Sequence, residues 1–379
     1  MKSYWKRMLL AGTTAIAMAA GLSLSTAQAK ADFGAFDFEA HRGGRDARPE
    51  NTLYSFAYAM ELGVTTLEMD MQLTKDGRIV ISHNPVMSPN LTKGPDGKYI
   101  PGGKYDLRTM TLAEIKKFEI GVMNPAAGDY YDGHGRSQMP IKDVRFPTLD
   151  EVFELANAYG NTKIIFNIET KSYPAPGDEG FVNCPDPATF TRKVYEVVKK
   201  YHMENRISLQ SFDWRTLVEM KRLDPNITLV ALTCEQPTWG PEPGNVCREV
   251  NKPGPSKWMA GLDIDDFQGD YVKAAHMIGA DVVSPYFPEL SLDLINEAHD
   301  LGMKIVPWTV NSKKDMVTML DMGVDGMISD KPWILRELLV SRNIPVAAPT
   351  PSPKNPFSTG TTLVAAQTKA LANGGDAAQ

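Results

Sequence analysis

The hydrophobic positions of this chain repeat in one order: an amphipathic helix, a glycine that ends it, and a short apolar run. In 51–62, Leu53, Phe56, Ala57 and Met60 lie at positions i, i+3, i+4 and i+7, which predicts a helix with one apolar face. Glycine ends such a helix because it adopts the left-handed backbone of the C-terminal cap. The junction recurs at Gly63, Gly279, Gly302 and Gly323, and it is typical of successive strand–helix units.

Counting the apolar runs gives eight predicted strands. They lie at Phe38–His41, 65–71, Lys163–Glu169, Arg206–Gln210, Ile227–Ala231 and at runs near residues 281, 304 and 325. Eight strands that alternate with helices favour an α/β fold with a closed parallel barrel. Two stretches rich in Gly and Pro, Pro85–Pro147 and Thr233–Gly261, interrupt the pattern. Because both follow predicted strands, we expect them to project over the catalytic end of the barrel.

Both ends of the chain depart from this pattern. Residues 1–29 combine a basic start, an apolar run near Met8–Leu22 and the sequence Ala27-Gln28-Ala29, which is typical of a signal peptide. We therefore expect a periplasmic or secreted protein that begins at Lys30 after cleavage. No later run reaches about 18 apolar residues, so stable membrane insertion is not expected. The barrel domain is predicted over 30–340, and the Pro-, Ala-, Ser- and Thr-rich segment 341–379 is predicted to be a disordered tail.

Composition excludes several classes of function. The chain has 40 Lys and Arg against 46 Asp and Glu, a formal net charge of −6, whereas a nucleic-acid-binding protein would need the opposite sign. Its three cysteines are too few for a disulfide scaffold and lack zinc-finger spacing. Export would permit a disulfide between Cys234 and Cys247, which share a Pro/Gly-rich loop; three free thiols are the alternative.

Three carboxylates lie at the ends of predicted strands. Glu68 and Asp70 are two residues apart, so a strand directs both side chains to one face. Glu169 ends the apolar run KIIFNIE. Three converging acids would repel one another unless a hard divalent cation, Ca²⁺ or Mg²⁺, bound between them. The pattern therefore predicts a metal site, although each acid alone would be interpreted as a solvated side chain or an ion-pair partner.

Two of the six histidines, His41 and His83, also follow predicted strands. Imidazole takes and gives protons near neutral pH. Of two imidazoles on opposite sides of a phosphate, one can therefore deprotonate the attacking group and the other can protonate the leaving group. Arg42 adds a planar guanidinium that matches phosphate oxygens, and Lys171 adds a point charge. Gln210 and Trp308, at two further strand ends, are predicted to contact substrate. The remaining histidines lie in predicted helices or, for His134, in a glycine-rich loop.

The ordered motifs resemble those of one enzyme family. The segment from Glu39 to Pro85 contains H-R-G, P-E-N-T, E-x-D, T-x-D-G and a second histidine, as in the glycerophosphodiester phosphodiesterase family. Later segments agree: 167–171 (NIETK), 211–213 (SFD), 308–311 (WTVN) and the closing GVDGMISDKP. The resemblance extends over most of residues 36–340.

This resemblance implies a TIM barrel with an insertion of about 85–147 and an exported, metal-dependent hydrolase. It implies that His41 and His83 are the acid/base pair, that Glu68, Asp70 and Glu169 are the metal ligands, and that Arg42 and Lys171 bind phosphate. The expected reaction converts a glycerophosphodiester, a small molecule, to sn-glycerol 3-phosphate and an alcohol. One departure is Asn84, where many family members have Asp.

Several alternatives stay open at this stage. Either histidine can be the base, and attack by the neighbouring glycerol hydroxyl is as compatible with these residues as attack by water. Trp308 can pack on the glycerol carbons or face the barrel interior. A phospholipase-type phosphodiesterase, acting on phospholipids or lysophospholipids, is the rival within hydrolases. A periplasmic solute-binding protein is the rival from another class, but it needs no histidines beside three carboxylates. Head-group preference, choice of Ca²⁺ or Mg²⁺ and oligomeric state are not determined.

Overall fold

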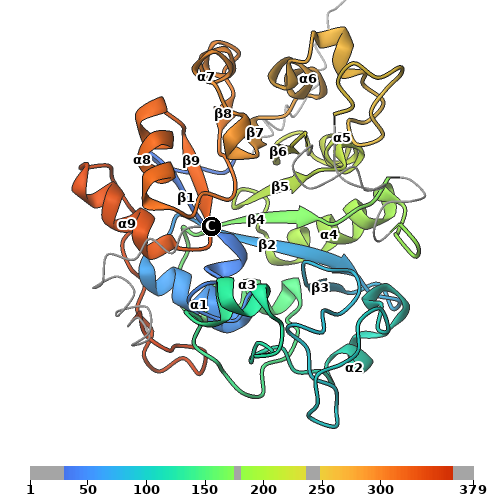
Figure 1. Cartoon of the computed structure of the whole chain (residues 1–379), viewed down its shortest axis with the longest axis vertical. Helices are drawn as coiled ribbons and strands as arrows, with labels where there is room; N and C mark the ends of the chain where they lie inside the picture. Colours follow the sequence, from blue (N-terminus) through green and yellow to red (C-terminus); the bar gives the residue numbers. More distant parts are fainter. Residues whose placement is uncertain (1–29, 175–180, 236–247, 362–379) are drawn as a thin grey trace, which may run out of the picture.

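The computed structural model describes residues 30–174, 181–235 and 248–361, and its centre is a barrel of parallel strands (Figure 1). In sheet order the strands are β8 (Lys304–Ile305), β7 (Val282–Pro285), β6 (Thr228–Thr233), β5 (Ile207–Ser211), β4 (Ile165–Thr170), β2 (Thr66–Leu73), β1 (Asp37–Ala40) and β9 (Gly326–Ser329). The amides of Asp325 and Ile328 donate to the carbonyls of Ile305 (2.9 Å) and Pro307 (3.0 Å), which joins the two ends of the sheet. The predicted TIM barrel is confirmed.

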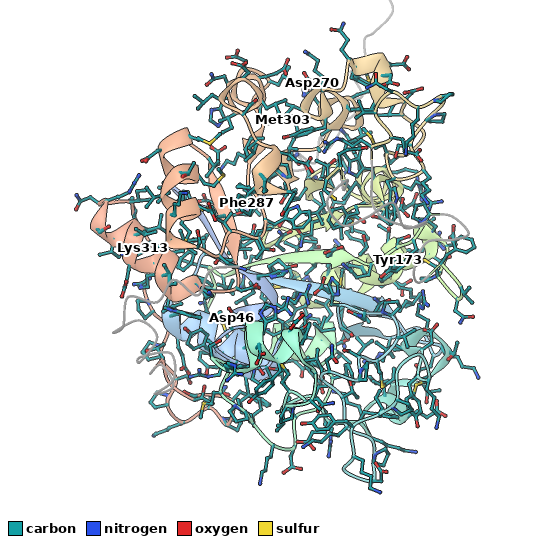
Figure 2. The ribbon with its side chains drawn as sticks, viewed as in Figure 1. Asp46, Tyr173, Asp270, Phe287, Met303 and Lys313 are labelled. Atoms are coloured by element: carbon teal, nitrogen blue, oxygen red, sulfur yellow. The ribbon has the colours of Figure 1, made fainter. Side chains whose placement is uncertain are left out.

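The helices surround this barrel on its outside (Figure 1). They are α1 (Leu53–Leu62), α3 (Leu149–Ala158), α4 (Pro187–Tyr201), α5 (Trp214–Leu223), α6 (Tyr271–Ile278), α7 (Leu292–Asp300), α8 (Lys313–Met322) and α9 (Pro332–Ser341). Thr52 begins α1 with a capping box to Ser55, and Gly63 ends it at φ +82°. Figure 2 shows the side chains between helices and strands, where the main hydrophobic core lies. Short helical turns are η1 (His41–Gly43), η2 (Leu107–Thr109), η3 (Tyr131–Gly135), η4 (Ile264–Phe267) and η5 (Phe287–Glu289).

The inside of the barrel has a polar half and an apolar half. Glu39, Asn167 and Gln210, from β1, β4 and β5, form a hydrogen-bonded row in which the Asn167 amide donates to Glu39 (2.9 Å) and to Gln210 (3.0 Å). On the other side, a separate cluster of Val230, Val282, Val306 and Ile328 packs with Trp308. Burying polar side chains is tolerated because they bond to one another. The polar half leads directly to the acidic residues described below.

A long segment between β2 and α3 forms a small unit of its own. Its first strand, β3 (Ile79–Ile81), pairs antiparallel with β2 and is not one of the barrel strands. The following residues contain α2 (Leu112–Ile115) and a separate hydrophobic core that includes Met87, Ile100, Leu107, Phe118 and Phe146. We call residues 82–147 the insertion. Figure 1 shows it in teal beside the arrowhead of β2.

Residues 342–361, in the segment predicted to be disordered, lie against the barrel instead. Ile344, Val346 and Phe357 pack on the main core, and the Thr350 amide donates to the Met60 carbonyl (3.0 Å). The segment has no periodic pattern of its own, so only contacts with distant parts of the chain order it. The described residues do not include 1–29, 362–379 or Cys247. The predicted disulfide between Cys234 and Cys247 therefore also lies outside them, and Cys234 is buried. No helix among the described residues has the length and apolar character to cross a membrane.

Candidate active site

Strand register brings the three predicted carboxylates together. Asp70 on β2 pairs with Glu169 on β4, and Glu68 pairs with Asn167, so the acids of two strands share one end of the barrel. A carboxylate oxygen from each of Glu68, Asp70 and Glu169 lies within 4.8 Å of one from each of the other two. All three side chains are buried. The i, i+2 spacing on one strand and the Asp70–Glu169 pairing across strands together account for this cluster, which we call the acidic triad.

The electrostatics of the acidic triad fit a divalent cation. Burial, with repulsion from Asp70 and Glu169, raises the pKa of Glu68 well above its ordinary value. Burial also raises the pKa of Glu169 to about 7, although Lys171 opposes the shift. Crowded carboxylates hold their protons when nothing else neutralises them, and a hard cation removes that repulsion. The donor set, three carboxylates facing one point, is the kind that Ca²⁺ and Mg²⁺ bind.

The loop after β1, residues 41–51, carries most of the remaining site and is called the catalytic loop. Arg42 and Asn51 adopt left-handed backbone conformations, with φ +50° and +55°. This conformation disfavours Arg42 by about 1–2 kcal/mol, whereas asparagine adopts it more readily. Gly43 is required because a Cβ there would lie 2.4 Å from Ser55 Oγ. Asn51 donates to Asp70 Oδ2 (2.9 Å), and the Arg42 amide donates to Glu68 Oε2 (2.8 Å). The strained loop is thus bound directly to the acidic triad.

Two cations border the acidic triad. The Arg42 guanidinium bonds to Glu50 Oε1 (2.9 Å) and lies 3.3 Å from Asp70 Oδ2. Lys171 Nζ lies 3.0 Å from Glu169 Oε1 and 3.6 Å from Asp70 Oδ1. Burial lowers the pKa of Lys171, but Glu169 and Asp70 outweigh it and raise that pKa above the ordinary value, so the ammonium stays charged. The structure therefore brings both predicted phosphate-side cations to the acidic triad.

His41 is held from the side away from the acidic triad. Its Nδ1 lies 2.5 Å from Asp330 Oδ1, and Asn311 donates to Asp330 Oδ2 (2.8 Å). His41 Nε2 lies 3.9 Å from Glu68 Oε2. With its proton on Nδ1, the imidazole presents the Nε2 lone pair to the site. Burial lowers the pKa of His41 against the opposing charge of Asp330, which favours this neutral form.

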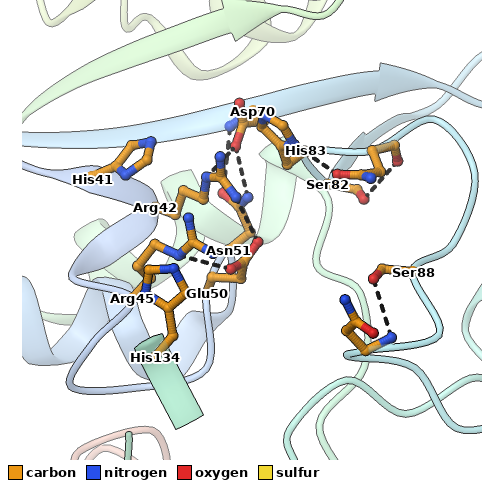
Figure 3. Close-up of polar contacts among 12 residues, drawn as sticks. His41, Arg42, Arg45, Glu50, Asn51, Asp70, Ser82, His83, Ser88 and His134 are labelled. Carbon is orange, nitrogen blue, oxygen red and sulfur yellow. Dashed lines mark hydrogen bonds and ion pairs between the residues drawn. The ribbon is translucent and has the colours of Figure 1, made fainter. Parts of the chain in front are cut away.

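His83 approaches from the insertion side, after β3. In Figure 3 the two imidazoles lie on opposite sides of the Arg42 guanidinium. His83 Nδ1 lies 2.7 Å from Asn84 Oδ1, so Asn84 supplies a neutral acceptor where Asp330 supplies a charged one to His41. Burial, together with the charges of Arg42 and Lys171, lowers the pKa of His83 well below its ordinary value. A pocket that is open to solvent lies beside it and is lined by His83, Asn84, Leu91 and Thr92.

Gln210 and Trp308 lie near the site in different ways. Gln210 is buried, donates to Glu68 Oε1 (2.7 Å) and accepts from Asn167. Its amide therefore holds Glu68 from the barrel interior instead of facing a substrate. Trp308 donates to the Ser284 carbonyl (2.9 Å) and contacts the rings of Phe212 and Tyr286. It remains partly exposed above the apolar half of the barrel.

Several residues of the site received no role from the sequence. Asp330 belongs to the closing GVDGMISDKP motif, and Glu50 and Asn51 belong to P-E-N-T, so the motifs marked them without a function. The insertion adds two more: Tyr130 donates to Glu50 (3.0 Å), and His134 Nδ1 lies 2.6 Å from Asp46 Oδ1. No spacing rule could relate these residues, since the contacts join segments far apart in the chain. They fasten the insertion to the catalytic loop.

Together, the parallel barrel, the acidic triad at the ends of its strands, the bordering cations and the two histidines define a TIM-barrel enzyme of the phosphoric diester hydrolase class. The sequence profile of the glycerophosphoryl diester phosphodiesterase family matches residues 41–333. The chain belongs to this family.

Individual relatives agree with this assignment. The chain is 29% identical over 300 residues to a glycerophosphodiester phosphodiesterase of Caldanaerobacter subterraneus, covering 79% of this chain and 96% of that one. A candidate glycerophosphoryl diester phosphodiesterase of Silicibacter pomeroyi has a crystal structure with TM-score 0.70 and 28% identity over 84% of this chain and 97% of that one. The fold also matches an Oleispira antarctica phosphodiesterase in complex with its product sn-glycerol-3-phosphate (TM-score 0.56, 20% identity, 80% and 96% covered).

Proposed function

We propose that this enzyme hydrolyses glycerophosphodiesters to sn-glycerol 3-phosphate and an alcohol, with a divalent cation and two histidines. The observation that carries the proposal is the acidic triad bordered by Arg42 and Lys171, with an imidazole on either side of Arg42. The family and the name of the Caldanaerobacter relative support the substrate class.

Glu68, Asp70 and Glu169 would hold the cation, Ca²⁺ or Mg²⁺. When bound, it supplies positive charge that stabilises the phosphate oxygens as negative charge develops in the transition state. Arg42 and Lys171 bind the remaining phosphate oxygens, which places the phosphorus beside the acidic triad. The ion pairs that these cations make with Asp70 and Glu169 hold both side chains in position before the substrate arrives.

Both histidines are prepared for proton transfer at Nε2. Asp330 and Asn84 accept from the Nδ1–H of His41 and His83, so each ring has its Nε2 lone pair free. One Nε2 takes the proton from the attacking hydroxyl, and the Nε2–H of the other, protonated ring gives a proton to the leaving alkoxide. Asp330 stabilises the imidazolium form of His41 by its charge, a contribution that the neutral Asn84 does not make to His83.

The direct test is release of glycerol 3-phosphate from glycerophosphocholine, measured with EDTA and then with added Ca²⁺ or Mg²⁺. We expect turnover only with the cation, and its loss in His41→Ala or His83→Ala. The exposed helix residue His276 supplies the matched control, His276→Ala. Absence of turnover on every glycerophosphodiester under every metal condition would refute the proposal.

The phospholipase-type rival is tested in the same assay with a lysophospholipid. It requires an apolar rim around the site. Among the described residues, most of the large apolar side chains with high exposure (Val218, Met277, Leu292 and Val340) lie on α5, α6, α7 and α9 on the outside of the barrel, and Val182 stands apart from them. Faster turnover of the lysophospholipid than of glycerophosphocholine would favour the rival.

We also propose that the enzyme acts in the periplasm or outside the cell. The support is the basic, apolar and small-x-small order of residues 1–29. N-terminal sequencing of the protein recovered from outside the cytoplasm should give Lys30 as the first residue. Recovery of an uncleaved chain from the cytoplasm alone would contradict this.

A further inference from the structure

Residues 342–361, called here the C-terminal strap, run along α1. The family match ends at residue 333, so the strap lies beyond it. At one end, the Thr350 amide donates to the Met60 carbonyl (3.0 Å), and the Thr350 hydroxyl oxygen accepts from Asn161 Nδ2 (3.0 Å). At the other end, the Phe357 ring meets Tyr54 edge-on at 5.2 Å. The strap therefore passes from the C-terminal turn of α1 to its first turn, next to the catalytic loop.

Beyond Phe357 the strap bonds to Arg48, a residue of the catalytic loop. Arg48 Nε donates to Thr359 Oγ1 (2.7 Å), and Nη2 donates to the Gly360 carbonyl (2.8 Å). The third nitrogen, Nη1, donates to the Ala47 carbonyl (2.8 Å), and the guanidinium lies over the Tyr58 ring at 4.7 Å. Arg48 is fully buried. A buried guanidinium requires its hydrogen bonds, and the strap supplies two of the acceptors.

Arg48 is tied through the backbone to the residues that face the substrate. Its amide donates to the Gly44 carbonyl (3.3 Å), and the Gly44 amide donates to the His41 carbonyl (2.8 Å). The same loop holds Arg42 and Asn51 in left-handed conformations that need external support. A displacement of Arg48 would therefore move the backbone that carries His41 and Arg42.

We propose that the C-terminal strap is a working part of the enzyme that fixes the catalytic loop through Arg48. Arg48 and Thr359 are positioning residues, since neither contacts the acidic triad or the histidines. Without the strap, the guanidinium loses two bonds in a buried site or rotates toward solvent, and either change loosens the loop. The activity readout of this proposal rests on the proposed function, whereas its structural readout does not.

The first test compares two truncations with the full chain: removal of 362–379, which leaves the strap, and removal of 342–379, which deletes it. Both truncated chains are assayed well below the melting temperature of the shorter one. Removal of 342–379 should lower kcat about tenfold or more relative to removal of 362–379. Amide hydrogen exchange should accelerate at residues 41–51 more than at β5 and β6. A general loss of stability would instead accelerate exchange throughout.

The second test uses full-length variants, in case the shorter truncation does not fold. Thr359→Val removes the Oγ1 acceptor and should lower kcat and raise exchange at 41–51, while Thr359→Ser keeps the hydroxyl and should restore both. Thr361→Val, at an exposed position, is the matched control. If deletion of the strap and Thr359→Val both leave kcat and exchange at 41–51 unchanged, the proposal is wrong. An inactive full chain would refute the proposed function, and the exchange data would still decide the role of the strap.

Discussion

At the scale of single residues, the ring of His41 is oriented by a carboxylate 289 positions away. Asp330 binds Nδ1, and Asn311 in turn binds Asp330 through its side chain and accepts from its backbone amide. The orientation is therefore set by a small hydrogen-bonded group around one barrel end. Such a group both selects the tautomer and stabilises the charged ring.

Substitution Asp330→Asn should keep an acceptor for His41 but remove the charge of this group and the bond from the Asn311 side chain. The amide oxygen can accept from Nδ1–H, yet it does not stabilise the imidazolium, so we expect kcat to fall by about 100-fold with little change in KM. Steady-state kinetics on glycerophosphocholine measure both constants. Asp293→Asn, at an exposed position of α7, is the control. An unchanged kcat would remove Asp330 from the positioning role.

Substitution Glu68→Gln should weaken cation binding before it affects folding. The variant keeps the acceptor for Gln210 Nε2, loses the acceptor for the Arg42 amide and removes one of the three carboxylate ligands. We expect the cation concentration for half-maximal activity to rise by about tenfold or more, because a carboxylate ligand is lost. The cation-free melting temperature should change little by comparison, because the raised pKa of Glu68 already favours its neutral form when no cation is bound. A titration with Ca²⁺ or Mg²⁺ and a thermal melt with EDTA test the two statements separately.

At the scale of elements, the catalytic loop is held by charges on both sides. Glu50 bonds to Arg42 and lies 3.0 Å from Arg45 Nε, and the Tyr130 hydroxyl of the insertion reaches the same carboxylate. Loop and insertion thus share Glu50 as a common partner. This arrangement makes the position of the insertion depend on ionised groups beneath it.

The Glu50 carboxylate should make stability depend on acid pH. Burial raises its pKa, but the charges of Arg45 and Arg42 outweigh this and lower the pKa from 4.5 to about 2. A lowered folded-state pKa adds stability above about pH 4.5, and this stability is lost as the pH falls toward 2. Glu50→Gln should therefore cost up to about 3 kcal/mol at pH 7.

Urea unfolding at several pH values checks this expectation. The difference in free energy of unfolding between the wild type and Glu50→Gln should become smaller as the pH falls below about 4.5. Asp300→Asn, at an exposed position, serves as the control. If this difference in free energy of unfolding stays constant from pH 7 down to about pH 2, the two arginines do not stabilise the ionised Glu50.

Docking of the insertion should depend on the Tyr130 hydroxyl. This hydroxyl donates to Glu50 and accepts from Arg45 Nη2 at 2.7 Å. Tyr130→Phe removes one hydrogen bond from Glu50 and one from Arg45, so the free energy of unfolding should fall by about 1–2 kcal/mol. The adjacent Tyr131, whose ring packs beside Gly135, provides the matched variant Tyr131→Phe. If Tyr130→Phe and Tyr131→Phe lower the free energy of unfolding equally, the hydrogen bonds of the Tyr130 hydroxyl contribute nothing specific to docking.

At the scale of the whole molecule, the barrel and most of its chemistry follow from patterns in the chain. The predicted strands agree with the observed ones to within about two residues, because alternation, helix periodicity and glycine caps are local properties. Two departures have different causes. β3 pairs outside the barrel because it is the second arm of a hairpin with β2, whereas residues 342–361 are ordered by contacts with α1 and Asn161, which are distant in the chain.

The sequence by itself determined the order of strands and helices, the placement of Glu68 and Asp70 on one face, and the motifs that mark His41 and His83. These features depend on neighbours a few residues apart, where the backbone geometry is known in advance. Only the tertiary structure decided which carboxylate holds His41, that Gln210 supports Glu68, and that the strap reaches Arg48. Each of those contacts joins residues from separate segments, and their distance is set by barrel closure and strand register.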